Sequence, residues 1–185
     1  MSHRGLRRGE GCGLEWHDLS MNSKEPTANI ERQRISVDGE IIEDTPKSDA
    51  GGRVIALGMA GAGVLKAHKA AQNKEPLAWG EAWGDSGKVF TQKNGEPLDP
   101  NWVSDEFDRL TDELDLPPIR LHDLRHGAAS LMLAAKVDMK VVQETLGHAN
   151  ITTTSNTYTS ANPDVAAAAA EATAAIVPRR SQREA

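Results

Sequence analysis

Residues 121–131 have the sequence LHDLRHGAASL, a polar cluster that leads into a run of small and apolar residues. We expect a helix from about 122 to 135, with His122 and Arg125 in its first turn. These two positions are three residues apart, so a helix places both side chains on one face. The free N–H groups and the dipole at that end of a helix favour a bound anion. An arginine and a histidine at a helix start are also common surface residues, and this stretch alone leaves both interpretations open.

The next segment predicts a helix over residues 139–146 that ends at a glycine. Val142 and Leu146 lie four positions apart, and Gly147 has the place of a C-cap. The imidazole of His148, which follows, is explained by an interaction with the helix end. Taken by itself, this segment favours a structural role.

The chain has a single tyrosine, Tyr158. We expect a further helix from near residue 152 to carry it, and alone it would be a half-buried helix residue. A free phenol has a pKa of about 10, so tyrosine becomes a useful nucleophile only where its surroundings favour the phenolate. Pro163 would open an alanine-rich helix that ends near residue 177.

The rest of the chain predicts a mixed architecture. Runs of β-branched and aliphatic residues between 29 and 57, with a hairpin signal at Asp38-Gly39, predict three short antiparallel strands. The fold class is therefore α+β, mainly helical with a small three-stranded antiparallel sheet. The other elements expected before residue 97 are a helix over 7–15, a helix over 60–72, a loop over 73–87 with Trp79 and Trp83 on one helical turn, a buried strand at Val89-Phe90 and a turn at Asn94-Gly95. Pro100 would then open a helix that Pro117-Pro118 stops. One face of that helix would carry Trp102, Val103, Phe107 and Leu110.

Composition describes an ordinary soluble domain. The chain has 185 residues, of which 38% are hydrophobic and 26% charged, enough for one domain with a real core. The single Cys12 excludes an internal disulfide and gives no zinc pattern. The N-terminus has no secretory signal, and no stretch reaches the ~18–20 apolar residues of a membrane span. We therefore expect a cytoplasmic protein.

Charge gives a mixed indication. The net charge of −6 argues mildly against a nucleic-acid partner. Net charge is a poor guide where positive residues cluster. Here they do, in Arg4, Arg7 and Arg8 and again in Arg179, Arg180 and Arg183.

Two further features are bland when each is taken alone. Arg7 and Glu10 are three residues apart, as in a salt-bridged surface turn. Lys47 follows Pro46 between two expected strands, where a lysine is usually solvated. Neither indicates function by itself.

Together, however, these residues form a recognisable order: Arg7, Lys47, His122, Arg125, His148, Tyr158. That order and spacing resemble the catalytic domain of the tyrosine recombinase (phage integrase) family. The match is closest in LHDLRHGAASL at 121–131 and continues through VVQETLGH at 141–148 to Thr157-Tyr158. The segment GLRRGE at 5–10, with GLEW at 13–16, resembles the first arginine box of the family. The resemblance covers roughly residues 4–162.

The resemblance implies site-specific DNA strand exchange without a metal or another cofactor. Tyr158 would attack a phosphodiester, forming a 3′-phosphotyrosyl enzyme and releasing a 5′-hydroxyl. A partner strand's 5′-hydroxyl would then reverse the step on a new junction. The other implied roles are phosphate binding by Arg7 and Arg125, general base or phosphate donor for His122, protonation of the leaving 5′-oxygen by Lys47, a phosphate hydrogen bond from His148, support of Arg7 or His122 by Glu10, and DNA contacts by Arg4, Arg8, Arg120 and His126.

The resemblance also sets expectations for organisation and partners. Residues 1–162 would be the catalytic domain, and 163–185 an alanine-rich helix with a basic tail. Family members carry further helices and a core-binding domain before the first arginine, so we expect a truncated chain that binds DNA weakly by itself. The chain would bind double-stranded DNA and assemble as a homotetramer on two DNA sites. Accessory DNA-bending or directionality factors would be further partners. The C-terminal helix would pack in its own subunit or on a neighbour.

Two alternatives stay open at this point. The chain could be a non-catalytic DNA-binding or assembly remnant of an integrase, because the N-terminal part expected of the family is missing. It could also relax supercoils by the same chemistry, as type IB topoisomerases do. The segments around His122 and His148 look more like those of integrases, which ranks the topoisomerase third.

Overall fold

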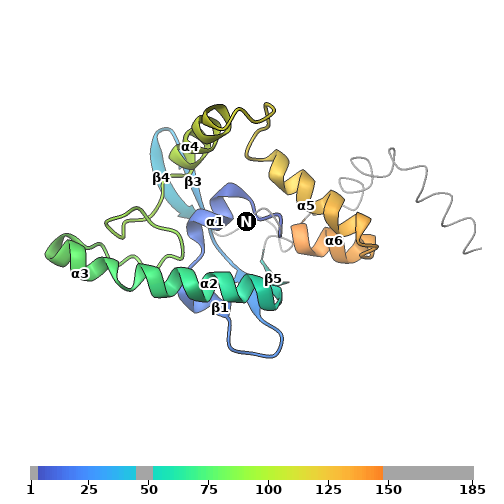
Figure 1. The fold of residues 1–185 in the computed structure, drawn as a ribbon, viewed down its shortest axis with the longest axis horizontal. Coiled ribbons are helices and arrows are strands. Elements are labelled where there is room, and N and C mark those ends of the chain that lie inside the picture. Colours follow the sequence, from blue (N-terminus) through green and yellow to red (C-terminus); the bar gives the residue numbers. More distant parts are fainter. Residues whose placement is uncertain (1–3, 45–51, 148–185) are drawn as a thin grey trace, which may run out of the picture.

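The structure is a computed structural model that describes residues 4–44 and 52–147 (Figure 1). It is α+β, as expected. Its elements are α1 (Arg8–Gly13), the 3-10 helix η1 (Trp16–Asp18), β1 (Leu19–Ser20), β2 (Thr27–Ile30), β3 (Gln33–Val37), β4 (Glu40–Asp44), β5 (Arg53–Ala56), α2 (Gly58–Gln72), α3 (Glu75–Trp79), the 3-10 helix η2 (Gly80–Ala82), α4 (Pro100–Glu113), α5 (Asp123–Ala134) and α6 (Met139–Leu146).

The strands form two sheets rather than one. A three-stranded antiparallel sheet has the order β1-β2-β5, with Ala28 opposite Ile55 and Ile30 opposite Arg53. The pair β3-β4 is a separate hairpin. Its turn is at Asp38 and Gly39, whose φ angles of 52° and 86° are those of a two-residue hairpin turn. The predicted turn is confirmed, while the sequence pattern merged strands that belong to different sheets.

The first apolar core packs against the three-stranded sheet. Ala28, Ile30 and Ile55 on β2 and β5 are each 1% exposed. Burial at alternate positions of β2 is the pattern of a sheet with one covered face. The remaining buried members of this core are Leu14, Leu57 and Val89.

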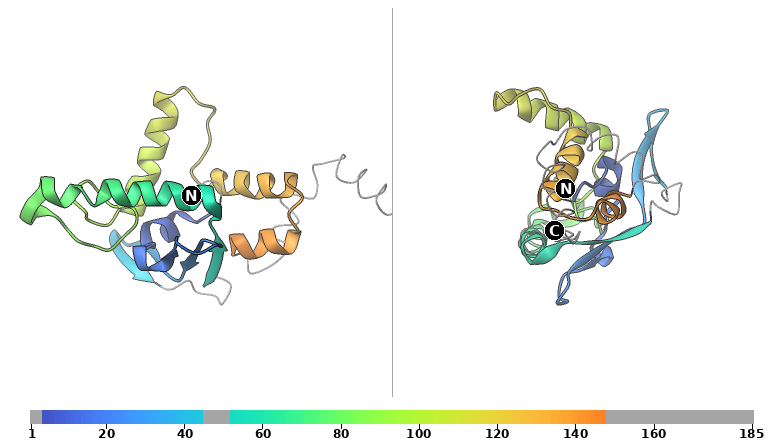
Figure 2. Two further views of the ribbon diagram at one scale, coloured as in Figure 1. Left: turned by 60° about the horizontal axis from the view of Figure 1, so that its bottom comes forward. Right: turned by 90° about the vertical axis from the view of Figure 1, so that its right-hand side faces the viewer.

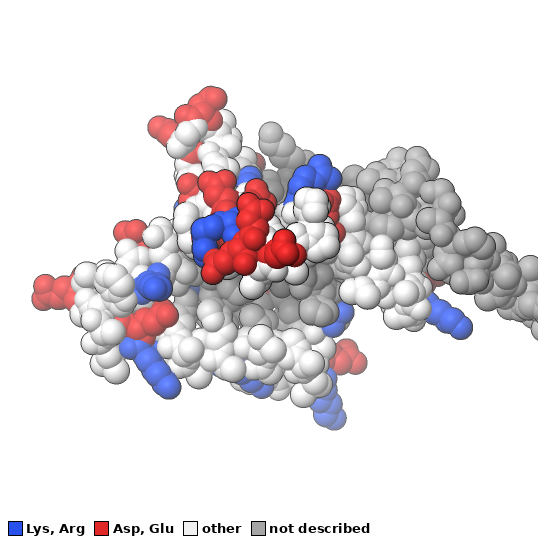
Figure 3. Space-filling view, turned by 45° about the horizontal axis from the view of Figure 1, so that its top comes forward, with Lys and Arg blue, Asp and Glu red and all other residues white. Residues whose placement is uncertain are grey.

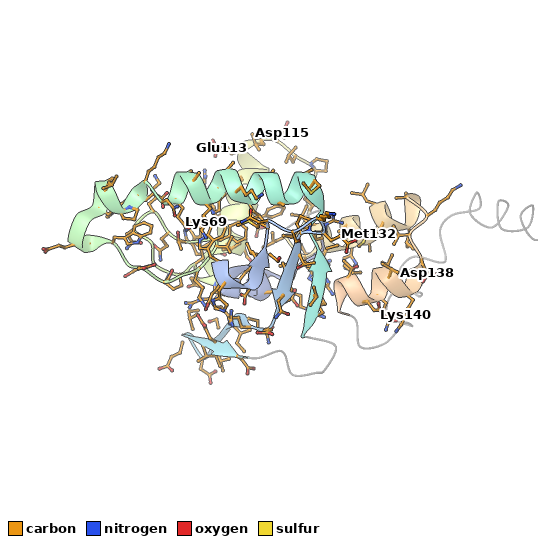
Figure 4. The ribbon with its side chains drawn as sticks, turned by 90° about the horizontal axis from the view of Figure 1, so that it is seen from below. Lys69, Glu113, Asp115, Met132, Asp138 and Lys140 are labelled. Carbon is orange, nitrogen blue, oxygen red and sulfur yellow. The ribbon has the colours of Figure 1, made fainter. Side chains whose placement is uncertain are left out.

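A second, smaller core lies between α5 and α6. Ala129, Val142 and Leu146 are fully buried there, and Met132 packs against them. The two helices lie together at one end of the molecule beside β5, opposite the end that carries α3 (Figures 1 and 2). Figure 4 shows Met132 on the side of α5 that faces α6. The predicted helices over 122–135 and 139–146 are confirmed within one residue.

Helix α4 projects from the body of the protein (Figure 2). Its predicted apolar face is only partly covered, because Trp102 is 52% and Leu110 40% exposed. Exposed acidic residues also lie along α4, and Figure 3 shows acidic side chains gathered over this helix. The helix ends at Glu113, before Pro117-Pro118. Asp115, between the helix end and the prolines, adopts a left-handed φ of 50°.

The region between α2 and α4 corrects two expectations. Residues 73–87 contain two short helices, α3 and η2. Trp79 ends α3, Gly80 with φ 54° begins η2, and Trp83 follows η2, so Trp79 and Trp83 do not share one turn of an α-helix. Val89 is fully buried but belongs to no strand; its neighbour Lys88 makes an isolated bridge to Glu15. The turn at Asn94-Gly95 is present. In the described part of the chain, every helix is too short or too polar to cross a membrane.

Candidate functional site

A cavity of about 320 Å³ brings together three of the predicted catalytic residues. Helix α1 contributes from one side, α4 and the start of α5 from the others. Arg7 lies more than a hundred positions from His122 and Arg125 in the chain, yet all three line this cavity. Its full lining is Leu6, Arg7, Arg8, Gly9, Ser104, Leu121, His122, Leu124 and Arg125.

Arg7 and Glu10 hold each other at the start of α1. Arg7 is the N-cap, and its backbone N–H donates to Glu10 Oε2 at 2.7 Å. Its Nη1 donates to Glu10 Oε1, also at 2.7 Å. The Glu10 side chain is 1% exposed, whereas that of Arg7 is 38% exposed and reaches the cavity. Of the two partners expected for Glu10, Arg7 is therefore the one with which it pairs.

Arg53, at the start of β5, is a member of this cluster that the sequence did not reveal. Its Nη1 and Nη2 donate to Glu10 Oε1 and Oε2, each at 2.9 Å. The Arg53 side chain is 7% exposed. A lone arginine after a Gly-Gly break carries no local pattern that would have identified it.

Two arginines keep the Glu10 carboxyl ionised. Burial alone would raise its pKa, because a carboxylate loses its hydration. The hydrogen bonds and charge of Arg53, together with those of Arg7, outweigh burial and hold the pKa of Glu10 below its ordinary 4.5. The carboxylate is therefore a fixed negative centre between two guanidinium groups.

The C-terminal end of α6 is held by three arginines on three successive carbonyls. Arg53 Nε donates to the Thr145 carbonyl at 2.9 Å. Arg125 Nη2 donates to Leu146 at 2.5 Å and Arg7 Nη2 to Gly147 at 2.7 Å. Carbonyls in the last turn lack helical partners and lie at the negative end of the helix dipole, so cations stabilise this end. Figure 4 shows Asp138 and Lys140 at the opposite end of α6, away from the sheet.

Arg125 also ties α5 to the N-terminal segment. Its side chain is buried, 4% exposed, and Nη1 donates to the Gly5 carbonyl. Gly5 has a φ of 62°, and a Cβ there would overlap the side chain of Leu146. Glycine suits both this conformation and this close approach, so Gly5 lets the segment before Arg7 pack against Leu146.

His122 is the N-cap of α5, where the structure leaves it accessible. Its ring meets the edge of the His126 ring at 5.1 Å between centroids. Partial burial, the neighbouring His126 and the charge of Arg125 lower the pKa of His122 below its ordinary 6.5. The imidazole is therefore neutral at pH 7 and able to accept a proton.

The side chains expected to contact DNA have different surroundings. Arg8 Nη1 donates to Ser104 Oγ at 2.6 Å and lines the cavity. Arg4 Nη2 donates to the Leu57 carbonyl at 3.0 Å. The exposed Arg120 pairs with Asp123 at 2.9 Å, and its hydrogen bonds lower the pKa of that carboxyl to about 2.

Lys47, His148 and Tyr158 lie outside the described residues, as do the expected helix from 152 and the alanine-rich helix. The structure therefore places Arg7, His122 and Arg125 at one cavity and Glu10 behind it. Within residues 4–44 and 52–147, His, Cys, Asp and Glu side chains form no group of three or more that could hold a metal ion.

Comparison with known proteins identifies the family. A model of the phage integrase family matches residues 1–164, and the chain belongs to that family. It is 29% identical over 169 residues to a XerC-like tyrosine recombinase of Caldanaerobacter subterraneus, covering 86% of this chain and 43% of the relative. It is 28% identical over 154 residues to the ICEBs1 integrase of Bacillus subtilis, covering 83% of this chain and 41% of the relative. The chain thus spans less than half the length of either relative.

Solved structures share the fold. The Tn1549 transposon integrase in complex with transposon right end DNA gives a TM-score of 0.77 at 24% identity, covering 94% of this chain and 56% of that one. XerA recombinase gives a TM-score of 0.66 at 22% identity, covering 97% of this chain and 56% of that one. The fold is that of tyrosine recombinase catalytic domains.

Proposed function

We propose that this chain is the catalytic domain of a site-specific DNA strand transferase that acts through a tyrosyl–DNA intermediate. The observation that carries the proposal is the shared cavity of Arg7, His122 and Arg125. Two guanidinium groups and a neutral imidazole at one cavity match the demands of phosphodiester chemistry. Tyr158, the single tyrosine of the chain, would be the nucleophile.

The chemistry needs positive charge that does not depend on pH. Attack on a phosphodiester increases negative charge on the non-bridging oxygens, and catalysis is mainly positioning and electrostatic stabilisation. Arg7 and Arg125 would bind those oxygens, because guanidinium groups stay charged and donate in pairs. The Tyr158 oxygen would form the new bond to phosphorus while the bond to the 5′-oxygen breaks.

Proton transfer assigns the remaining roles. His122, neutral at pH 7, would accept the phenolic proton or donate to the phosphate. Lys47 would protonate the departing 5′-oxygen, and His148 would donate to a phosphate oxygen. The bond from Arg7 to the Gly147 carbonyl supports the last assignment, because it holds the residue before His148 at this cluster. Glu10 would keep Arg7 in place.

The proposal extends to partners and domain organisation. Double-stranded DNA would be the substrate, with Arg4, Arg8, Arg120 and His126 near its backbone. A homotetramer on two DNA sites and accessory factors would complete the assembly in the cytoplasm. Residues 1–162 would form the catalytic domain, with 163–185 contributing a helix in its own or a neighbouring subunit.

A covalent-trapping experiment tests this function. The chain is incubated with a pool of nicked duplexes of randomised sequence. Cleavage close to the nick releases a short fragment that bears the 5′-hydroxyl. This fragment diffuses away, so the strand cannot be resealed. We expect DNA linked to the protein in the parent chain and none in the matched variant Tyr158→Phe. Sequencing the linked DNA identifies the preferred site. An adduct that persists in Tyr158→Phe would refute the nucleophile, and no adduct in the parent would favour the non-catalytic remnant.

A further inference from the structure

Arg53 has a side chain that is only 7% exposed, and it has as yet no role in the site. It does not line the cavity in which Arg7 and Arg125 would bind the phosphate. It instead connects three elements: from β5, it bonds Glu10 on α1 and the Thr145 carbonyl on α6. We propose that Arg53 is a positioning residue, which sets Arg7 and the end of α6 for the phosphodiester reaction. This inference rests on the proposed function.

The hydrogen bonds show how Arg53 acts through Glu10. Glu10 Oε1 accepts from Arg53 Nη1 at 2.9 Å and from Arg7 Nη1 at 2.7 Å. Glu10 Oε2 accepts from Arg53 Nη2 at 2.9 Å and from the Arg7 backbone at 2.7 Å. Both oxygens are thus shared, and the orientation of the carboxylate that holds Arg7 is fixed by the planar fork of Arg53.

Charge gives Arg53 a second task. If Glu10 paired with Arg7 alone, the two charges would cancel and Arg7 would attract a phosphate weakly. Arg53 adds a second guanidinium to the same carboxylate, so Arg7, Arg53 and Glu10 together carry two positive charges and one negative charge. At 7% and 1% exposure of Arg53 and Glu10, water screens this interaction little.

The third bond of Arg53 concerns α6. Its Nε donates to Thr145 while Arg125 and Arg7 bind the next two carbonyls, at Leu146 and Gly147. Arg53 therefore fixes the helix end on which two phosphate-binding arginines also converge. A lysine has one nitrogen and cannot bind the Glu10 carboxylate in a fork and Thr145 at once.

The test measures single-turnover adduct formation at saturating DNA, using DNA recovered from the trapping experiment. We compare the parent with Arg53→Met, Arg53→Lys and the matched control Arg32→Met. Arg32 also bonds a carboxylate twice, Asp18 at 2.9 and 2.7 Å, but away from the cavity. Misplacement of a reacting group by about 1 Å lowers rates on the order of 100-fold, which is the loss expected for Arg53→Met. Arg32→Met should stay within about threefold of the parent, as expected for a site remote from the chemistry.

A second substrate separates positioning from a merely structural role. A methylphosphonate at the scissile position has no negative charge on its non-bridging groups and needs less help from Arg7. The deficit of Arg53→Met should shrink to about tenfold or less on this substrate, because the lost charge stabilisation matters less. Arg53→Lys, which keeps the charge, should remain about tenfold below the parent on the phosphodiester, because it lacks the fork.

Several outcomes would overturn the role of Arg53. They are an unchanged rate in Arg53→Met, full rescue by Arg53→Lys, or equal deficits on both substrates. Thermal unfolding of each variant shows whether it is folded. If Arg53→Met does not fold, the rates of adduct formation by Arg53→Lys on the two substrates test the role of Arg53 instead. An inactive parent would defeat the proposed function and this role with it, whereas an active parent with an unaffected Arg53 variant would defeat this role alone.

Discussion

Two clusters of charged side chains in the described part of this protein differ in their charge balance. The arginine cluster contains three guanidinium groups and one carboxylate, from Arg7, Arg53, Arg125 and Glu10. The lysine cluster, joined by ion pairs of 3.5 Å or less, contains three Lys or Arg side chains and three carboxylates, from Lys88, Arg32, Arg34, Glu15, Asp18 and Glu43. Both join segments that are far apart in the sequence.

The difference separates a binding site from a structural joint. In the lysine cluster, Lys88 Nζ lies 2.8 Å from both Glu15 and Glu43, so its charge is matched locally. In the described part of the arginine cluster, positive charge exceeds negative charge, and backbone carbonyls accept the surplus hydrogen bonds. Such a cluster beside a cavity favours an anion, and the balanced one does not.

The largest expected effect concerns the single carboxylate of the arginine cluster. Glu10→Ala should lower the free energy of unfolding by about 3–5 kcal/mol, because it leaves buried guanidinium groups without their partner. The matched control, Glu15→Ala in the lysine cluster, should lose only about 1 kcal/mol, because Glu15 is partly exposed and Lys88 keeps Glu43. Urea unfolding of both variants measures this, and equal losses would contradict the contrast.

Glu10 also gives the free energy of unfolding a defined pH dependence. The folded-state pKa of Glu10 lies below 4.5, so its contribution is complete above that value and is lost as the pH falls through the folded pKa. Urea unfolding of the parent at acid pH should show this loss of unfolding free energy. In Glu10→Ala, the part of the pH dependence that comes from Glu10 should be absent.

The next effect concerns the pH dependence of the chemistry. The pKa of His122 is lowered below 6.5, and a general base must be neutral. The rate of adduct formation should therefore fall about tenfold per pH unit below that pKa and level off above it. Single-turnover rates between about pH 5 and 7 in the parent and in His122→Gln measure this. A parent rate without this dependence would remove His122 as the base.

The smallest effect on the rate of adduct formation is expected in the lysine cluster. Lys88→Met should lower the free energy of unfolding by about 1–2 kcal/mol, because Glu15 and Glu43 are partly exposed and water reaches them. Adduct formation should stay within about threefold of the parent, because the change is remote from the reacting groups. A tenfold loss of the rate with a folded protein would show that the two clusters are not functionally distinct.

The elements that the sequence predicted best are those with local signals. Gly147 ends α6 with a φ of 67°, and Asp38-Gly39 turns the β3-β4 hairpin, because each glycine adopts a conformation that other residues rarely do. The division of the strands into two sheets was not predicted, because each short run has the same composition and only packing decides its partner.

The site divides in the same way. Arg7, His122 and Arg125 could be proposed from their motifs, and the structure brings them to one cavity. Arg53 could not, since nothing in its immediate neighbours distinguishes it from a solvated arginine.

The sequence by itself therefore determined helices α5 and α6, the turn at Asp38-Gly39, the family and the order of the candidate catalytic residues. Only the tertiary structure decided that Arg7 and Gly147, 140 positions apart, bond to each other and that Glu10 is shared by two arginines. The physical reason is that caps and turns depend on neighbouring residues, whereas charge pairing depends on distances that folding alone sets.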